Sequence, residues 1–254
     1  MKTFENATAN IDGRSVDEGL RAHMSRVYAT MSFGMLVTFA TALIISVLAV
    51  SDIPGPSQIG ADRYLTSLGE ALYLSPLKWV VMFAPLALVL IIGGAMKSLT
   101  AGTAKVLFNI FAAVMGLSIS SIFLIFTGQS IVQIFLITAI AFAGLSLWGY
   151  TTRKDISAWG NFLIMGVIGL IAAAIVNIFI GSSSLSFAIS AIAVLVFAAL
   201  TAHDTQRIKT DYIAQARMAD ADWMTKVVIM AALSLFLNFI NMFIGMLSLF
   251  GNRE

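Results

Sequence analysis

Long runs of apolar residues, separated by short polar stretches, dominate this sequence. A helix needs about 20 such residues to cross a hydrocarbon core that is roughly 30 Å thick. Seven runs meet or approach that length, and they cover residues 27–50, 79–96, 106–126, 131–150, 162–180, 185–202 and 227–250. The composition agrees, because 59% of the 254 residues are hydrophobic, 11% are charged and the mean hydropathy is +0.93. The sequence therefore predicts an all-α, polytopic membrane protein with seven transmembrane helices.

Two of the connections between the predicted helices are very short. Only "TGQS" (residues 127–130) separates the third and fourth helices, and only "GSSS" (residues 181–184) separates the fifth and sixth. Such tight hairpins make the flanking helices antiparallel neighbours. The longer connections, residues 51–78 and 203–226, are too short to form a second domain.

The distribution of basic residues predicts which side of the membrane each connection faces. With a cytoplasmic N-terminus, 12 of the 15 Lys and Arg residues fall on the cytoplasmic side, namely Lys2, Arg14, Arg21, Arg26, Lys97, Lys105, Arg153, Lys154, Arg207, Lys209, Arg217 and Lys226. The other side receives Arg63, Lys78 and Arg253. Because loops rich in Lys and Arg stay in the cytoplasm, we expect the C-terminus outside. We also expect a flexible cytoplasmic tail over residues 1–20 and a single transmembrane domain over residues 21–254.

One carboxylate adjoins a predicted span. Asp204 follows the sixth apolar run directly, whereas the other acidic residues fall in tails or connections. A carboxylate at membrane depth is costly unless it is paired, and such residues often mark ion or proton pathways. The alternative places Asp204 at the water interface, in a solvated cluster with Arg207 and Lys209.

The seventh predicted span carries a polar stripe. In "LSLFLNFINMF", Ser234, Asn238 and Asn241 are spaced i, i+4 and i+7, so they share one face of a helix. We expect that face to meet protein or a wet cavity. Ordinary hydrogen bonding between helices is the alternative explanation, with about 0.6 to 2 kcal/mol per contact in a membrane.

Motifs that would indicate an enzyme are missing from the sequence. There is no H-E-x-x-H zinc motif, no G-x-S-x-G elbow, no P-loop and no cysteine. His203 could titrate near neutral pH beside Asp204, yet one histidine makes a poor metal site. The formal charge of +2 is too small to indicate nucleic-acid binding. We therefore expect no catalysis, no cofactor and no firm metal site.

Four ordered motifs resemble those of the Bax inhibitor-1-like family, also called the transmembrane BAX inhibitor motif family. They are "VMGLSISSIF" (residues 114–123), "GYTTRKDIS" (residues 149–157), "LTAHDTQRIK" (residues 200–209) and "ALSLFLNFINMFIGMLSLFGNR" (residues 232–253). The resemblance covers about residues 21–253. It implies seven helices with the last one central, and a pH-sensitive calcium leak.

In that family two aspartates hydrogen-bond each other and control the leak. The first corresponds to Asp204 and the second to position 238, where this chain has an asparagine. An asparagine cannot share a proton with Asp204, so we expect gating to shift to lower pH or to lose its pH dependence. The resemblance also implies a basic latch, for which Lys97 is the nearest match and Arg207 the next. His203 stands where a tyrosine is more usual.

The sequence thus predicts a bacterial inner-membrane protein that mediates or regulates slow movement of Ca²⁺ or another cation. Asp204 would be the gate carboxylate on the Ca²⁺ path, Asn238 its partner, and Ser234, Asn241 and His203 supporting residues. An alternative is a membrane-embedded regulator that binds a membrane protease or another membrane protein through its cytoplasmic tail. A transporter for a small metabolite is a third reading.

Overall fold

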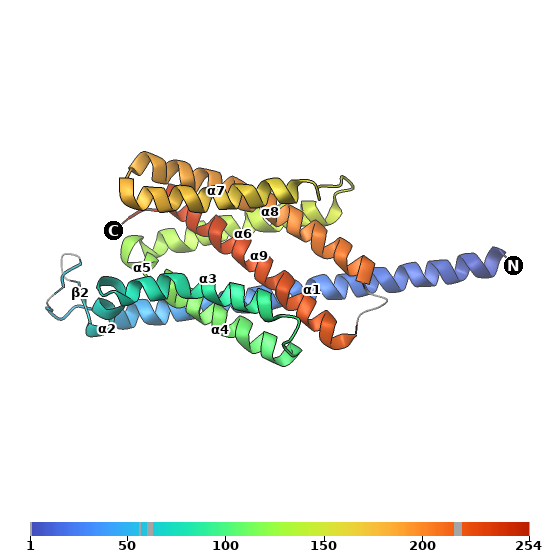
Figure 1. Ribbon diagram of the computed structural model, residues 1–254, viewed down its shortest axis with the longest axis horizontal. Helices are drawn as coiled ribbons and strands as arrows, with labels where there is room; N and C mark the ends of the chain where they lie inside the picture. The colour runs from blue at the N-terminus through green and yellow to red at the C-terminus, as the bar shows by residue number, and fades with distance from the viewer. Residues whose placement is uncertain (1, 56, 60–62, 216–219, 254) are drawn as a thin grey trace. The chain divides into compact units, whose positions relative to one another are not determined.

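The computed structural model describes residues 2–55, 57–59, 63–215 and 220–253, with side chains from residue 17 onward. The long helices are α1 (Lys2–Ala49), α3 (Leu77–Ala95), α4 (Ala101–Ile119), α6 (Gly128–Thr151), α7 (Trp159–Ile180), α8 (Ser183–Gln215) and α9 (Ala221–Phe250) (Figure 1). The short elements are β1 (Val50–Ser51), β2 (Tyr64–Leu65), α2 (Ser67–Gly69), η1 (Glu70–Leu74) and α5 (Ile122–Ile125).

Seven helices within the described part of the chain are long and apolar enough to cross a membrane. They coincide with the seven predicted runs, and α4 and α5 together form one span, Ala101–Ile125. The predicted all-α, polytopic membrane protein is therefore confirmed. Helix α1 begins at Lys2. The division of the chain into a cytoplasmic tail and a transmembrane domain at residue 20 stays a prediction.

The predicted connection over residues 203–226 is wrong, because most of it is helical. Helix α8 continues to Gln215, and α9 begins at Ala221 with the Asp220 carboxylate accepting a hydrogen bond from the Trp223 backbone N–H at 2.7 Å. Hydropathy detects where a helix leaves the apolar layer, whereas the helix ends only where its backbone hydrogen bonding ends. Arg217, assigned above to the cytoplasmic side, lies outside the described residues.

The predicted tight hairpin between the fifth and sixth spans is confirmed. Gly181 ends α7 with a φ of 65°, the left-handed conformation that glycine adopts without a steric cost, and α8 starts at Ser183. The Gly181 N–H donates to the Asn177 carbonyl at 2.8 Å, and the Ser182 N–H donates to the Asn177 side-chain oxygen at 3.0 Å. Asn177 therefore holds the turn.

The chain divides into two compact units. Unit 1 contains Met1–Met31 and Leu136–Leu249, and unit 2 contains Ser32–Phe135 and Phe250–Glu254. Helices α1 and α6 each contribute to both units.

The core of unit 1 is built on α9. In the apolar 18-residue stretch of α9, 67% of the residues are buried, a larger share than in any of the other six spans. This burial agrees with a helix that is surrounded by protein. Phe239 packs edge-on against Phe142 of α6, with ring centroids 5.5 Å apart. At Gly245 α9 and α8 approach closely, because a Cβ there would lie 2.9 Å from the Val194 side chain and 3.2 Å from the Ser190 carbonyl oxygen. The position of α9 in this core matters because it carries Ser234 and Asn238.

Unit 2 has an ordered cap at the end of its helices. Strands β1 and β2 pair antiparallel, with Val50 opposite Leu65. The Ser57 hydroxyl donates to the Glu70 carboxylate at 2.6 Å, and the Tyr73 and Ser120 hydroxyls lie 2.8 Å apart.

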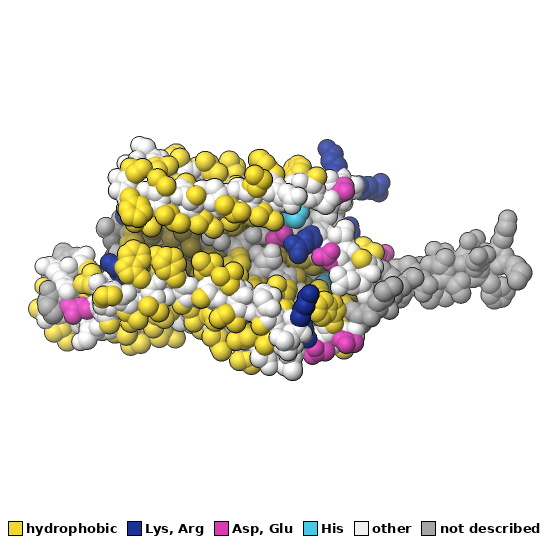
Figure 2. All heavy atoms as spheres, viewed as in Figure 1, with side chains coloured by type: hydrophobic (Ala, Val, Ile, Leu, Met, Phe, Trp, Pro, Cys, Tyr) yellow, Lys and Arg dark blue, Asp and Glu magenta, His cyan; other side chains and the backbone are white. Residues whose placement is uncertain are grey.

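Hydrophobic side chains cover the lengths of the helices on the face shown in Figure 2, and charged side chains gather near the helix ends. Large apolar side chains are highly exposed, such as Phe179 at 85% and Phe162 at 76% on α7. A surface of this kind is stable against lipid hydrocarbon rather than water.

Candidate functional site

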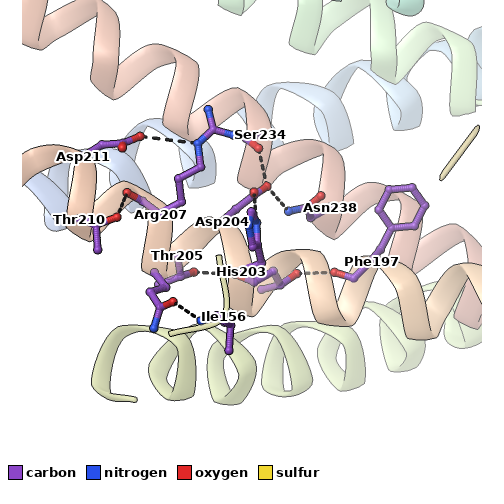
Figure 3. A network of polar contacts seen from close by, with 12 residues as sticks. Ile156, Phe197, His203, Asp204, Thr205, Arg207, Thr210, Asp211, Ser234 and Asn238 are labelled. Carbon is purple, nitrogen blue, oxygen red and sulfur yellow. Dashed lines mark hydrogen bonds and ion pairs between the residues drawn. The ribbon is translucent and has the colours of Figure 1, made fainter. Parts of the chain in front are cut away.

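Asp204 lies inside α8 and is buried, with 8% of its surface exposed. Its Oδ2 atom accepts hydrogen bonds from the Ser234 hydroxyl at 2.6 Å and from the Asn238 amide nitrogen at 2.9 Å (Figure 3). Its Oδ1 atom lies 3.2 Å from Nδ1 of His203. We call these four residues the Asp204 site.

The helical spacing of α9 explains why two of its polar residues reach the same atom. Ser234 and Asn238 are one turn apart, so their side chains lie on one face of the helix. Asn241, the third residue of the predicted stripe, turns back and donates to the Leu237 carbonyl of its own helix at 2.8 Å. The structure thus brings Asp204, Ser234 and Asn238 together, and Asn241 is not part of the contact.

The alternative of a solvated cluster around Asp204 is wrong. The Nε atom of Arg207 lies 3.6 Å from the Asp211 carboxylate, and both side chains are exposed. Lys209 donates to the Tyr150 carbonyl at 2.8 Å and lies over the Tyr150 ring. Arg207 and Lys209 therefore interact with groups other than Asp204. Long basic side chains prefer to place their charged ends in water, and Asp204 is buried away from such positions.

The predicted latch residues lie in different units. Arg207 belongs to unit 1 and pairs with Asp211, as described above. Lys97 follows the end of α3 in unit 2. A latch role for either residue stays a prediction.

Glycine at two positions permits helices to approach α8 beside the site. At Gly149 of α6 a side chain would collide with the Ala202 carbonyl. At Gly160 of α7 a Cβ would lie 2.8 Å from Nε2 of His203, so the imidazole ring packs directly on the α7 backbone.

A buried chain of hydroxyl groups, which sequence reasoning also missed, runs along the other side of α8. Thr205 donates to the Thr201 carbonyl at 2.8 Å, and its hydroxyl lies 2.9 Å from that of Ser146 on α6. Ser146 in turn hydrogen-bonds the Tyr28 hydroxyl of α1. These contacts join α1, α6 and α8 within unit 1.

Three of the four motifs quoted above are linked to one another through α8. Gln206 of "LTAHDTQRIK" donates to the Lys154 carbonyl at 2.8 Å and accepts from the Ile156 N–H at 3.0 Å, both in "GYTTRKDIS". Asp204 of the same motif contacts Ser234 and Asn238 of the last motif. The motifs are therefore parts of one contact region in unit 1.

The chemistry of the site is that of a buried anion surrounded by neutral donors and one histidine. No group of three His, Cys, Asp or Glu residues within the described ranges could hold a metal ion. Outside the spans, hydrogen bonds from the hydroxyl and the backbone N–H of Ser157 lower the pKa of Asp155 from its ordinary value of 3.8. Asp155 lies on the loop that Gln206 holds.

A bundle of apolar helices joined by short turns, with a carboxylate buried between two of them, defines a multi-pass integral membrane protein. The family model described as "Inhibitor of apoptosis-promoting Bax1" matches residues 20–254. The chain belongs to this Bax inhibitor-1-like family, as the motifs predicted.

Several bacterial proteins are similar over nearly their whole length. The chain is 44% identical to an uncharacterized protein of Caulobacter vibrioides over 241 residues, covering 94% of this chain and 92% of the relative. It is 36% identical to the inner membrane protein YbhL of Escherichia coli K12, covering 100% of both. It is 38% identical to the uncharacterized protein RP147 of Rickettsia prowazekii, covering 100% of this chain and 98% of the relative.

Proposed function

We propose that this protein mediates a slow leak of Ca²⁺ or another cation across the bacterial inner membrane, and that the Asp204 site is its gate. The observation that carries the proposal is the double hydrogen bond from α9 to one oxygen of Asp204. Similarity to a protein named as an inner membrane protein supports the location. We further propose that the protein is not an enzyme.

The bonds to Asp204 form a clasp between α8 and α9. A buried carboxylate is costly without donors, and hydrogen bonds to an ionised oxygen are roughly twice as strong as bonds between neutral groups. Separation of α9 from α8 would leave Asp204 without these donors, so the closed arrangement is favoured while they are present. A change of partners at Asp204 is the step that lets the helices separate.

The hydrogen bonds between α8 and α9 predict different results for two asparagines of α9: replacement of Asn238 should raise the leak, and replacement of Asn241 should not. In liposomes loaded with a Ca²⁺ indicator, Asp204→Ala and Asn238→Leu should raise the leak, by about tenfold for a loss on the order of 1.4 kcal/mol. Asn241→Leu is the matched control, because Asn241 donates to its own helix and should leave the leak near the wild-type value. Leaks that are unchanged or lower in Asp204→Ala and Asn238→Leu would contradict the gate.

Asp204 lies toward the cytoplasmic end of α8 in the topology that we propose, with the N-terminus inside and the C-terminus outside. The excess of Lys and Arg on that side supports the orientation.

A regulator that acts on a membrane protease through the N-terminal segment is the second reading. Leu20 is 4% exposed and Gly19 packs against Tyr212, so a deletion that tests the segment should stop before Asp17. Removal of residues 2–16 should leave the Ca²⁺ leak intact if the protein is itself a leak. A leak that disappears with the segment would count against our proposal.

A further inference from the structure

We infer that the hydroxyl groups of Tyr28, Ser146 and Thr205 are positioning groups for the Asp204 site. They fix the rotation of α8 about its own axis, and so they direct the Asp204 carboxylate at its donors on α9. This inference rests on the proposed function in the first of its two tests, where the leak reports whether the clasp is closed. We call the three groups the hydroxyl chain.

The direction of each hydrogen bond in the hydroxyl chain follows from its last contact. The Thr201 carbonyl can only accept, so Thr205 donates its one hydroxyl hydrogen to it, at 2.8 Å. Thr205 must then accept from Ser146, whose hydroxyl lies 2.9 Å away, and Ser146 must accept from Tyr28. The chain therefore runs in one direction, from α1 through α6 to the backbone of α8.

Burial makes the hydrogen bonds of the hydroxyl chain hard to replace. Thr205 has 0% of its surface exposed and Ser146 has 4%. Loss of one hydroxyl leaves a buried neighbour without its partner, which costs more than the same loss in water. Gln206 and Lys209 also bond α8 to α6 and to the loop that follows it, but both side chains are half-buried, so water can take over their contacts. The hydroxyl chain is thus the buried part of this attachment.

The hydroxyl chain and the clasp hold different faces of α8 at the same level. Thr205 directly follows Asp204, and consecutive residues of an α-helix point about 100° apart around its axis. A rotation of α8 by roughly 10° moves a side-chain atom that lies about 5 to 6 Å from the axis by about 1 Å. A displacement of that size breaks hydrogen bonds of 2.6 and 2.9 Å, so the clasp requires that the rotation of α8 is fixed.

Removal of the Thr205 hydroxyl should therefore weaken the clasp, although Thr205 touches none of the donors on α9. Thr205→Val keeps the shape of the side chain and leaves the Ser146 hydroxyl hydrogen without its acceptor. Thr205→Ser keeps the hydroxyl and is the conservative variant. Thr38→Val is the matched control, because Thr38 is a buried threonine of unit 2 that donates to the Ala112 carbonyl at 2.7 Å.

The first test measures the Ca²⁺ leak from liposomes in two backgrounds. In the wild-type background Thr205→Val should raise the leak about threefold, as expected for partial loss of the bonds to α9, and Thr205→Ser should not. In the Asp204→Ala background the group to be positioned is absent, so Thr205→Val should add nothing. Thr38→Val should leave the leak near the wild-type value.

A purely structural role of Thr205 predicts an equal rise of the leak in both backgrounds, and that result would overturn the inference. An unchanged leak in Thr205→Val, or a rise of the same size in Thr38→Val, would overturn it too. Ser146→Ala breaks the hydroxyl chain at a second position and should give the same pattern as Thr205→Val. Tyr28→Phe should add nothing to Ser146→Ala, since the Tyr28 hydroxyl has then already lost its acceptor.

The second test does not depend on transport. In nanodiscs, ¹⁵N NMR of asparagine-labelled protein should show the Asn238 side-chain amide, which the Asn238→Leu variant identifies. Its hydrogen bond to Asp204 should slow the exchange of this amide with water in the wild type and in Thr38→Val. Thr205→Val should accelerate the exchange about threefold or more. Exchange that is equally slow in Thr205→Val and in the wild type would overturn the inference.

The two proposals fail in different ways. A leak unaffected by Asp204→Ala contradicts the gate itself, and the exchange of the Asn238 amide still tests the hydroxyl chain. A leak that responds to Asp204→Ala but not to Thr205→Val contradicts only the role of the hydroxyl chain.

Discussion

Gln206 of α8 and Ile156 of the connection between α6 and α7 are joined by a hydrogen bond, from the Ile156 N–H to Oε1 of Gln206 at 3.0 Å. The same amide donates to the Lys154 carbonyl at 2.8 Å, and the Ile156 side chain is 2% exposed. One side chain therefore fastens this loop to the helix that carries Asp204.

Replacement of Gln206 by alanine should lower the stability of the protein. Two hydrogen bonds to backbone groups are lost, one of them partly buried, so we expect a cost of about 1 to 2 kcal/mol. Unfolding in mixed micelles measures the change. Gln133→Ala, at an exposed position of α6, is the control and should have little effect. A Gln206→Ala protein as stable as wild type would show that the loop is held by other contacts.

A methyl group at Gly160 should displace the His203 ring. The added Cβ would lie 2.8 Å from Nε2, so the ring or α7 must move, at a cost of about 1 to 3 kcal/mol. Gly160→Ala should therefore lower the stability of the protein, measured by unfolding in mixed micelles. Gly169→Ala is the matched control on α7, because a Cβ there meets no atom within 4 Å. Equal behaviour of the two variants would contradict the packing of His203 on α7.

The orientation can be tested with single cysteines, because the natural chain contains none. Lys154 is exposed on the loop before α7, and Ser184 is exposed at the start of α8, next to the other end of α7. In spheroplasts, a membrane-impermeant maleimide should label Ser184→Cys directly. Lys154→Cys should react only after the membrane is permeabilised. The reverse pattern would place the N-terminus outside.

The loop near α7 should loosen in acid. Hydrogen bonds from Ser157 lower the pKa of Asp155, so the ionised carboxylate stabilises the turn above the ordinary value of 3.8. That contribution is lost as the pH falls through the lowered pKa. Hydrogen exchange of the Ser157 amide should accelerate over this range, and Asp155→Asn should reduce the dependence on pH. Exchange that is equally slow at acidic pH in the wild type would contradict the contact.

The sequence predicted the spans well because hydropathy reports directly on the cost of placing residues in lipid. It also identified Asp204, Ser234 and Asn238, since polar residues on apolar helices are rare and costly. The same reasoning missed the continuation of α8 to Gln215, because residues 203–215 are polar but contain no Gly or Pro to end a helix. Proximity along the chain also suggested Arg207 and Lys209 as alternative partners of Asp204, whereas Arg207 pairs with Asp211 and Lys209 bonds the Tyr150 carbonyl.

The sequence by itself determined the class of protein, the seven spans and the family, because each depends on local composition or on ordered motifs. Only the tertiary structure decided which donors reach Asp204, that Asn241 bonds its own helix, and that His203 lies between Asp204 and Gly160. The physical reason is that a hydrogen bond depends on a few tenths of an ångström and on the rotation of each helix about its axis. Packing sets both quantities, and hydropathy carries information on neither.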